Sequence, residues 1–555
     1  MATRFKRHMS IPEFFARSVQ QYGPRVAVRV PVSRRGVMQF QDATYRELWD
    51  LSGKLAAWLA EQGIGAGDRV GLISKPSVGW AVAFFAVQRL GAVVVPMDGG
   101  LQPGEVARLM NECEAKMLFC APHRYHEFTP LSREVPSLKE VISVDVALGA
   151  VSLWDVMPNR DVPIPDARPD CEDLAVLMYT SGTTDDSKGV MLCHRNITAN
   201  IEAFLKVIEF TSADSVVTIV PWYHIYGLTA TLLAPLWAGA TVTYTDDYRN
   251  LVAFARRVGV TVLVGVPKLY HSLWRRILEN IEGNTMRRLL HRFLPKAVGK
   301  MLKKRLLGTQ FRFFVSGGAP LAAEVGAGLR RLGLGMIEGY GLTETAPVLT
   351  MSDPFTPIPG NVGRPLPGVK VKLDKPDIEG YGEVIAWGPN VMLGYYKNPE
   401  RTAEVLTPDG WFRTGDIGKL DVEGRLFLAG RKKNLVVLES GKKVHPEELE
   451  WHFSQIPEIE EVLVYEDVSR GEPMVAAMVY PNWQLLKKQG IESPEVAKAR
   501  VWEKIREAQR DLAPFKRLRD KDCIRIVEQP FEKSTKQDIK RHLYVGRSPR
   551  QIGQP

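Results

Sequence analysis

RVGLIS (Arg69–Ser74) and AVVVPM (Ala92–Met97) are the two stretches that decide the fold. Both have the length and apolar character of a strand, and Trp80–Leu90 between them has the composition of a buried helix. A strand that is apolar on both faces is typical of a parallel sheet covered by helices on both sides. The sequence therefore predicts an α/β fold around these residues.

The same alternation extends in both directions along the first two thirds of the chain. Thr44 and Glu47 form a capping-box pattern that predicts the start of a helix, and apolar residues recur at helical spacing up to Leu59. Further strands are expected at Lys116–Ala121, Leu174–Thr180, Ser215–Val220, Thr261–Val266 and Phe311–Ser316. This pattern predicts two parallel-type α/β subdomains.

After about Gly360 the character of the sequence changes. Val369–Leu373, Glu383–Trp387 and Arg425–Ala429 are short strand-like segments between turns rich in Gly and Pro, which indicates a β-rich subdomain. From about Lys433 onward the sequence is charged and favours a small α+β domain.

Composition excludes several classes of protein. The chain has 555 residues, of which 45% are hydrophobic and 25% charged, as in ordinary globular proteins, so a disordered chain or a coiled-coil rod is excluded. No apolar run approaches the ~18–20 residues of a membrane span, and the N-terminus lacks the apolar core of a secretory signal. Five scattered cysteines without a CxxC pair favour a reduced, cytoplasmic protein.

The positive charge is concentrated in one segment. The formal net charge is +10, but Arg287–Arg305 alone holds eight Lys or Arg and no Asp or Glu, and without them the net charge is +2. A basic surface extending over the whole protein, as nucleic-acid binding would require, is therefore not indicated.

A loop rich in glycine and hydroxyl groups is expected to bind phosphate. Tyr179–Val190 (YTSGTTDDSKGV) follows a predicted strand, and we expect a helix after it. Backbone N–H groups, hydroxyls and one ammonium group suit polyphosphate oxygens. The residues concerned are Thr180, Ser181, Gly182, Thr183, Thr184 and Lys188. The spacing differs from that of a Walker A loop, and a flexible surface turn is the alternative.

This loop resembles the phosphate loop of the adenylate-forming (AMP-binding) superfamily, which includes acyl-CoA synthetases, aryl-CoA ligases and luciferases. Four more motifs of that family follow in its order, together with the start of its C-terminal domain. They are SGGAP (316–320), GYGLTE (339–344), WFRTGD (411–416), GRKKN (430–434) and GKKVHPEELE (441–450). The resemblance implies a large N-terminal AMP-binding domain at 1–431, a small mobile C-terminal domain at 432–545 and a flexible tail at 546–555.

The resemblance implies a ligase that uses ATP, Mg²⁺ and coenzyme A. A carboxylate attacks the α-phosphate of ATP, and a thiol then displaces AMP from the acyl-AMP. In this family Glu344 would bind magnesium, Thr343 would bind phosphate, and Tyr340 would stack on adenine. The adenine-side and signature loops would contribute Gly318, Ala319, Pro320, Gly339 and Gly341. A glutamate placed at a helix N-terminus is the alternative for Glu344.

The later motifs imply ribose and coenzyme A contacts. Asp416 would accept both ribose hydroxyls, Arg431 would contact ribose or phosphate, and Lys433 would be the hinge between the domains. A turn aspartate and a surface salt bridge are the alternatives for Asp416 and Arg431. The pantetheine tunnel would be lined by Ser440, Gly441 and Lys442.

An aromatic segment is expected to line the acyl pocket. Pro221–Gly227 (PWYHIYG) follows a predicted strand, and the family places His224 near the substrate carboxylate. A hydrogen-bonded histidine of the core is the alternative for His224.

Two positions depart from the family pattern. Asp185 replaces a glycine of the phosphate loop, so weaker ATP affinity or a shifted loop is expected. Asp538 occupies the position of a catalytic lysine, and Lys536, two residues earlier, is our candidate for that role. Losing such a charged donor would cost about 10²–10³ in rate.

The branch most similar in sequence is that of medium- and long-chain fatty acyl-CoA ligases, which implies a role in fatty acid metabolism. The alternatives are an acyl-AMP ligase that loads a carrier protein and a degenerate nucleotide- or acyl-binding protein without ligase activity. The basic, apolar stretch Met286–Gly308 is expected either to rest on the inner membrane surface or to form a solvated helix pair, with Pro295 and Gly299 interrupting the helix. We expect no nucleic-acid partner.

Overall fold

The computed structural model describes residues 7–34, 37–159, 163, 167–180, 188–356, 358–440, 442–533 and 539–545. The chain forms two compact units. The first holds the described residues up to Thr180, from Lys188 to Val371 and from Ala386 to Phe412. The second holds Lys372–Ile385 and the described residues from Arg413 onward. Each unit is described by itself below.

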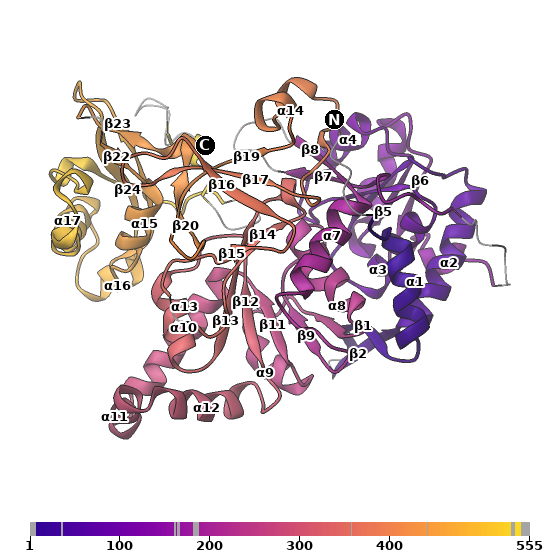
Figure 1. The fold of residues 1–555 in the computed structure, drawn as a ribbon, viewed down its shortest axis with the longest axis horizontal. Helices are drawn as coiled ribbons and strands as arrows, with labels where there is room; N and C mark the ends of the chain where they lie inside the picture. Colours follow the sequence, from indigo (N-terminus) through magenta and orange to yellow (C-terminus); the bar gives the residue numbers. More distant parts are fainter. Residues whose placement is uncertain are drawn as a thin grey trace. The chain divides into compact units, whose positions relative to one another are not determined.

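The predicted strands at Arg69–Ser74 and Ala92–Met97 lie at the centre of a seven-stranded sheet in the first unit (Figure 1). Its order is β18 (Gly394–Tyr395), β8 (Lys188–Cys193), β7 (Leu174–Thr180), β4 (Val93–Pro96), β3 (Arg69–Ile73), β5 (Met117–Cys120) and β6 (Glu140–Ser143). Strands β7, β4, β3, β5 and β6 are parallel, whereas β8 and β18 are antiparallel to their neighbours. Helix α3 (Val78–Arg89) connects β3 to β4 and is buried along its whole length.

A nine-stranded sheet forms the rest of the first unit. Its order is β15 (Arg364–Pro365), β14 (Val348–Met351), β13 (Gly335–Gly341), β12 (Phe313–Ser316), β11 (Val262–Gly265), β9 (Ser215–Thr218), β10 (Thr241–Tyr244), β1 (Val26–Arg34) and β2 (Val37–Thr44). The strands from β13 to β1 are parallel, and antiparallel strands close both edges. The predicted capping box is confirmed at the start of α2 (Tyr45–Glu61), where Thr44 and Glu47 cap each other.

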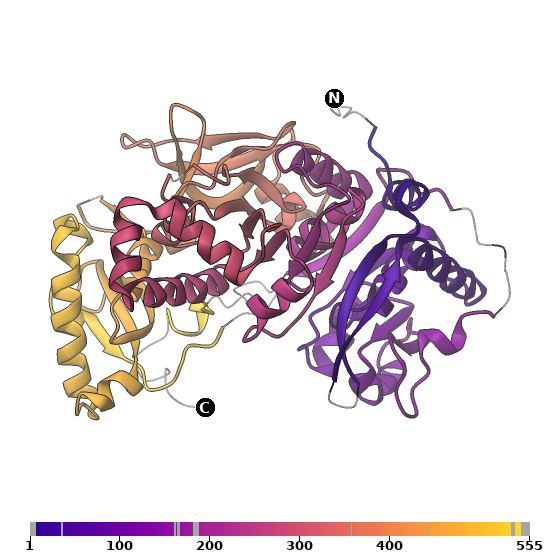
Figure 2. The same ribbon diagram turned by 90° about the horizontal axis from the view of Figure 1, so that it is seen from below.

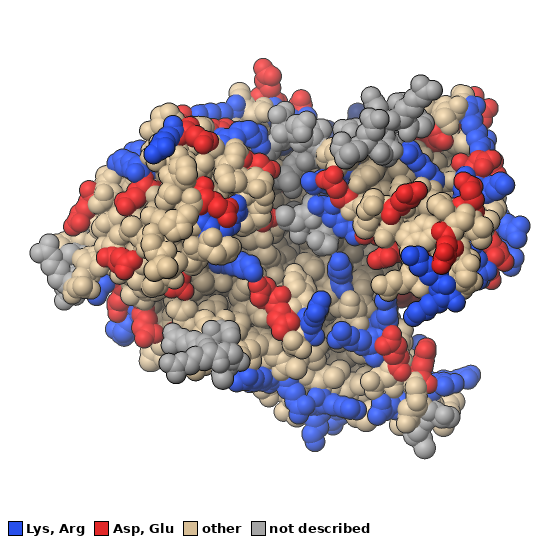
Figure 3. Space-filling view, turned by 180° about the vertical axis from the view of Figure 1, so that it is seen from behind, with Lys and Arg blue, Asp and Glu red and all other residues tan. Residues whose placement is uncertain are grey.

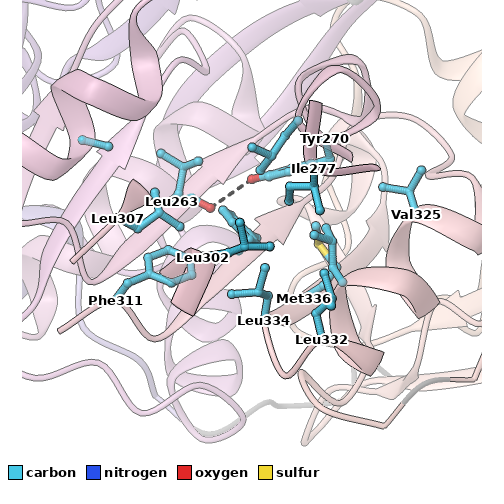
Figure 4. Packing of buried hydrophobic residues seen from close by; sticks show 14 of the residues in the cluster. Leu263, Tyr270, Ile277, Leu302, Leu307, Phe311, Val325, Leu332, Leu334 and Met336 are labelled. Atoms are coloured by element: carbon cyan, nitrogen blue, oxygen red, sulfur yellow. Dashed lines mark hydrogen bonds between the residues drawn. The ribbon is translucent and has the colours of Figure 1, made fainter. Parts of the chain in front are cut away.

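Helices cover one face of this sheet with a continuous hydrophobic core (Figure 4). The helices are α9 (Leu251–Arg257), α10 (Pro267–Glu282), α12 (Pro295–Leu306) and α13 (Ala323–Arg331). The hydroxyl of Tyr270 in α10 donates to the carbonyl oxygens of Leu263 at 2.9 Å and Val315 at 2.7 Å, so the helix is fixed to both β11 and β12. Apolar contacts and buried hydrogen bonds together set the position of α10 on the sheet.

The remaining helices of the first unit connect or flank the two sheets. They are α1 (Ile11–Tyr22), α4 (Pro103–Glu112), α5 (Tyr125–Phe128), α6 (Leu153–Val156), α7 (His194–Leu205), α8 (Ala234–Trp237), α11 (Thr285–Phe293) and α14 (Pro399–Val405). A π-helical turn, Gly227–Leu233, precedes α8. Among the residues with an assigned position, no helix is both long and apolar enough to cross a bilayer.

The second unit contains most of a four-stranded sheet and an α+β fold. The four strands are β16 (Lys370–Asp374), β17 (Gly382–Trp387), β19 (Phe412–Leu420) and β20 (Leu426–Arg431). The α+β part contains β23 (Ile459–Asp467), β24 (Met474–Pro481), β25 (Ile524–Ile526) and the helices α15 (Pro446–Ser454), α16 (Trp483–Lys488) and α17 (Pro494–Ala508). The predicted fold class, a large α/β part with a β-rich piece and a small α+β part, is confirmed.

One local expectation is met only after an intervening strand, and another is wrong. The segment directly after the phosphate loop is strand β8, which pairs with β7, and the expected helix, α7, begins at His194. Gly299 does not interrupt a helix, because it lies inside α12; Pro295 does begin that helix. Glycine is needed at position 299 because a Cβ there would lie 1.8 Å from the carbonyl oxygen of Leu332.

This close approach gives a stability test. We expect Gly299→Ala to lower the free energy of unfolding of the first unit by about 1–3 kcal/mol, since the helix must move away from Leu332. Gly104, another helical glycine, has no atom within 4 Å of an added Cβ, so Gly104→Ala leaves stability unchanged or raises it by up to about 1 kcal/mol. Denaturant unfolding of both variants measures the difference, and equal midpoints would contradict the packing described for Gly299.

Candidate active site

The loops after three parallel strands meet at one edge of the nine-stranded sheet. Pro221–Gly227 follows β9, Gly317–Pro320 follows β12, and Tyr340 lies at the end of β13. Carboxyl ends of parallel strands share an edge, which is where α/β proteins bind ligands. The ring of Tyr226 packs against Gly317, where a Cβ would lie 3.0 Å from it, and its hydroxyl donates to the carbonyl of Gly265 at 3.2 Å.

The adenine-side loop turns sharply after β12. Gly318 has φ +86°, a backbone conformation that favours glycine, and it is exposed. Ala319 is half-buried and Pro320 is exposed. These three residues therefore present backbone surface at the carboxyl edge of the sheet, as a nucleotide-binding loop requires. Their contact with adenine stays a prediction.

The signature residues end β13 and form a short 3₁₀ turn, Thr343–Thr345. Tyr340 and Thr343 are buried, whereas Gly339 and Glu344 are half-buried. A Cβ at Gly341 would lie 1.8 Å from the carbonyl oxygen of Pro347, so only glycine fits this turn. Gly339 has open space beside it, since the nearest atom to an added Cβ is 4.0 Å away.

Two buried asparagines form hydrogen bonds to the backbone of the signature turn and of the strand that follows it. The side-chain amide of Asn200 in α7 donates to the carbonyl of Val348 at 2.7 Å and accepts from its N–H at 3.2 Å. Asn390 donates to the carbonyls of Thr345 at 2.8 Å and Val348 at 3.3 Å. Neither residue was predicted from the sequence. The available signal was the pair Asn196 and Asn200, two asparagines four residues apart on the same helix.

Glu344, Tyr395 and Lys188 lie together where the two sheets of the first unit meet. The hydroxyl of Tyr395 in β18 donates to Oε1 of Glu344 at 2.8 Å. The ammonium group of Lys188 lies over the ring of Tyr395, 5.3 Å from its centroid. Partial burial lowers the pKa of Lys188, with Arg401 acting in the same direction, while Glu344 raises it. The sequence analysis missed Tyr395, which belongs to a strand of only two residues.

The carboxylate of Glu344 fits a magnesium ligand. Tyr395 is the only described side chain that donates to it, and it does so at one oxygen. The described part of the chain contains no group of three His, Cys, Asp or Glu residues arranged to hold a metal. Magnesium that is bound mainly by nucleotide phosphates requires only one or two protein carboxylates.

The phosphate loop is framed by a strand pair. Thr180 and Lys188 pair with each other at the end of β7 and β8 that the loop connects. The residues between them, including the predicted contacts Ser181, Gly182, Thr183 and Thr184 and the departure at Asp185, lie outside the described residues. The position of Lys188 beside Tyr395 nevertheless places one end of this loop next to Glu344.

His224 lies in the aromatic segment at the same edge. It is half-buried, and its ring centroid is 4.8 Å from that of Tyr223. The neighbouring Trp222 is fully buried and packs edge-on against Trp80 at 5.4 Å. Trp222 is therefore a core residue, whereas His224 stays a candidate for contact with the substrate carboxylate.

In the second unit, the predicted ribose residues Asp416 and Arg431 face each other. They are register partners of β19 and β20, and Arg431 Nε lies 2.9 Å from Asp416 Oδ1. The backbone N–H of Asp416 donates to the hydroxyl of Thr414 at 3.1 Å, and that hydroxyl donates to the carbonyl of Val384 at 2.7 Å. Asp416 is buried and held in one orientation, while Arg431 is exposed.

The predicted hinge follows directly and is polar. Lys432 pairs with the buried carboxylate of Glu383 at 2.9 Å, and Arg413 pairs with the same carboxylate at 3.0 Å. Lys433 is exposed within the short turn Lys432–Asn434. Nothing in this geometry tests rotation at Lys433, so the hinge stays a prediction.

The predicted pantetheine residues lie at the tip of a small hairpin. Strands β21 (Val436–Val437) and β22 (Lys443–Val444) flank the turn. Ser440 and Lys442 are exposed, and the ammonium group of Lys442 lies 4.8 Å from the centroid of the Phe515 ring. Gly441 lies outside the described residues.

The candidate catalytic lysine, Lys536, and the departure Asp538 lie outside the described residues. The residues on either side are fixed by ion pairs. Lys533 pairs with Glu461 of β23, and Arg541 pairs with Glu450 of α15. Burial raises the pKa of Glu450, although Arg541 and the N–H of Val464 act against this effect.

Comparison with known proteins identifies the family. A family model described as "AMP-binding enzyme" matches residues 15–396, and a second, described as "AMP-binding enzyme C-terminal domain", matches residues 433–553. The chain is 29% identical over 530 residues to the peroxisomal long chain acyl-CoA synthetase 7 of Arabidopsis thaliana, covering 87% of this chain and 75% of that protein. It is 27% identical over 458 residues to the medium-chain fatty-acid–CoA ligase of Escherichia coli, covering 79% and 76%.

Solved structures agree with this assignment. The crystal structure of ATP-bound MatB from Rhodopseudomonas palustris matches with a TM-score of 0.78 and 27% sequence identity, over 96% of this chain and 98% of that one. The match extends over almost the whole length of both chains.

The buried asparagines give a second stability test. We expect Asn200→Ala to lower the free energy of unfolding by about 2–4 kcal/mol, because the buried N–H of Val348 loses its side-chain partner and its carbonyl keeps only the bond from Asn390 at 3.3 Å. Asn111 is exposed and makes one bond, to the carbonyl of Glu134, so Asn111→Ala is the matched control and costs less than about 1 kcal/mol. Denaturant unfolding compares the two, and similar losses would show that Asn200 does not hold the turn.

Proposed function

The chain belongs to the AMP-binding enzyme family, and we propose that it is an AMP-forming acid–thiol ligase that converts a medium- or long-chain fatty acid to its coenzyme A thioester. The observation that carries this proposal is the convergence of Glu344, Tyr395 and Lys188 beside the nucleotide-binding loops. Relatives that are named as long- and medium-chain fatty acid ligases support the substrate class.

The reaction has two balanced steps. In the first, a carboxylate oxygen of the fatty acid attacks the α-phosphorus of ATP, the bond to the β-phosphate oxygen breaks, and pyrophosphate leaves. In the second, the thiol sulfur of coenzyme A attacks the acyl carbonyl, the thiol proton is lost, and AMP leaves. Such phosphoryl chemistry depends mainly on positioning and charge neutralisation.

The first unit supplies the charges for the first step. Lys188, at the end of the phosphate loop, neutralises phosphate oxygens, and Thr343 donates a hydrogen bond to them. Glu344 would hold magnesium, which would supply charge neutralisation at the phosphates. The hydroxyl of Tyr395 fixes the Glu344 carboxylate, so the ligating oxygen is oriented before ATP binds. Tyr340 and Gly318–Pro320 bind adenine, and His224 contacts the substrate carboxylate.

The second unit supplies the ribose and coenzyme A contacts. Arg431 and Thr414 hold Asp416 in one orientation. In that orientation its carboxylate accepts hydrogen bonds from the ribose hydroxyls. Ser440–Lys442 line the pantetheine path. Lys536 contacts the attacking carboxylate and the α-phosphate in place of the family lysine. The functional domains are residues 1–431 and 432–545, with the hinge at Lys433.

We rank two other functions below that of a coenzyme A ligase. An acyl-AMP ligase would pass the acyl group to a carrier protein, and a degenerate binder would hold nucleotide or acyl ligand without turnover. Asp185 and Asp538 are the residues that favour the degenerate binder. We also propose peripheral contact with a membrane through residues 286–308.

The deciding experiment is pyrophosphate release with ATP and Mg²⁺ across free acids from acetate to oleate, with and without coenzyme A. We expect release with medium- or long-chain acids and formation of the acyl-CoA thioester. Release without thioester formation would favour the carrier-protein ligase. Absence of release with every acid, together with measurable ATP binding, would overturn the ligase proposal.

The role of Tyr395 gives a sharper test of the site. We expect Tyr395→Phe to lower kcat/KM for ATP about tenfold and to raise the magnesium concentration needed for half-maximal rate, because the Glu344 carboxylate loses the hydrogen bond that orients it. Tyr396→Phe removes the neighbouring hydroxyl and should change either value less than twofold. Steady-state kinetics at varied Mg²⁺ measures both, and equal behaviour of the two variants would contradict the positioning role.

A further inference from the structure

Helix α11 (Thr285–Phe293) lies on the surface of the first unit, and none of its described side chains is buried (Figures 1 and 2). Its apolar side chains are among the most exposed in this unit. Leu289 is 56% exposed, Phe293 is 68% exposed, and Leu294, the residue before α12, is 57% exposed. A helix with this composition gains no stability from a core, so its apolar residues have no role inside the described fold.

Helix α12 (Pro295–Leu306) divides its residues between two environments. Val298 and Leu302 are buried in the core of the nine-stranded sheet, and Gly299 lies against the backbone of Leu332. Met301 on the outer side is 44% exposed, and Lys300 is exposed beside it. The core therefore fixes α12 firmly, and α12 presents a second, outer face that carries both cations and an apolar side chain.

The charge of this segment has one sign. Eight cations lie on α11 and α12: Arg287, Arg288, Arg292, Lys296, Lys300, Lys303, Lys304 and Arg305. Within the part of the chain that the structure describes, none of these eight side chains forms an ion pair with a carboxylate. In Figure 3, Lys and Arg side chains gather along the lower edge of the molecule, over these helices.

We propose that α11 and α12 form a docking surface for an anionic lipid bilayer. Cations that form no ion pair among the described residues match the negative surface potential of such a bilayer, and exposed Leu, Phe and Met side chains enter its interfacial region. A nucleic-acid backbone is bound through cations and offers no apolar surface. It would leave the exposed side chains of Leu289 and Phe293 without a partner. The interleaving of both residue types on the same outer surface favours the bilayer.

The docking surface adds a source of substrate to the proposed function and rests on that function only for the identity of the substrate. Medium- and long-chain fatty acids partition into membranes, so a ligase held at the bilayer surface takes its substrate from the lipid phase. Docking itself needs no turnover, because it depends only on the exposed residues of α11 and α12. Vesicle binding and ligase activity therefore succeed or fail separately.

The experiment is co-sedimentation of the full chain with vesicles of phosphatidylcholine, with and without 30 mol% phosphatidylglycerol. Two variants test the surface, and two matched variants of exposed residues in the second unit are controls. The cation variant is Arg292→Gln, Lys296→Gln, Lys300→Gln and Lys304→Gln, and its control is Lys487→Gln, Lys488→Gln, Arg506→Gln and Arg510→Gln. The apolar variant is Leu289→Gln, Phe293→Gln and Leu294→Gln, and its control is Ile378→Gln, Val422→Gln and Val468→Gln.

We expect binding to the anionic vesicles that weakens with added salt, and little binding to neutral ones. The cation variant should lose nearly three orders of magnitude in affinity, since each of its four cations contributes about fivefold, and the apolar variant about tenfold or more. Both controls should bind as the unchanged protein does. Thermal unfolding and octanoate activation confirm that the variants stay folded.

Three results would overturn the proposal. The first is no binding to anionic vesicles, and the second is equal loss in the variants and their controls. The third is binding to duplex DNA or to an acidic carrier protein that exceeds vesicle binding and survives the apolar variant. Vesicle binding by a protein that releases no pyrophosphate would support the docking surface and overturn only the ligase.

Discussion

The hydrogen bond from Tyr395 to Glu344 joins the two sheets of the first unit at the point where their loops meet. Glu344 follows β13 of the nine-stranded sheet, and Tyr395 belongs to β18, the edge strand of the seven-stranded one. The backbone N–H of Met392 donates to the carbonyl of Glu344 at 2.9 Å, so the contact has a main-chain part as well. Because β18 pairs with β8, this bond also fixes the distance between Glu344 and Lys188 at the start of β8.

Side-chain amides make this junction possible. The turn after β13 leaves the N–H and carbonyl of Val348 and the carbonyl of Thr345 away from water, and buried groups of this kind are costly unless bonded. An amide both donates and accepts, so Asn200 satisfies both groups of Val348 at once. A carboxylate at that position would accept but would repel the carbonyl oxygen. The geometry of the turn that carries Glu344 therefore depends on buried amides that lie behind it.

Much of this architecture follows from local sequence, because apolar strands such as Arg69–Ile73 are buried on both faces and their periodicity is unambiguous. The ordered motifs identify the family for the same reason, since each is a contiguous run. Tyr395 and Asn390 were missed because their roles depend on partners 42 to 51 residues away in sequence, and the two-residue strand β18 has no period. The strand between the phosphate loop and the expected helix was not predicted, because pairing with β7 decides the conformation of Lys188–Cys193. Gly299 was expected to interrupt a helix because the residue that requires a glycine there, Leu332, is distant in sequence.

The position of α12 relative to the strands explains how a surface contact and a nucleotide site coexist in one unit. Lys303 near the end of α12 lines a cleft together with Phe311, Arg312 and Phe313, which lead into the amino end of β12. The loops proposed to bind nucleotide follow the carboxyl ends of the same parallel strands, at the opposite edge of the sheet. A partner that covers α11 and α12 would therefore leave the carboxyl edge uncovered.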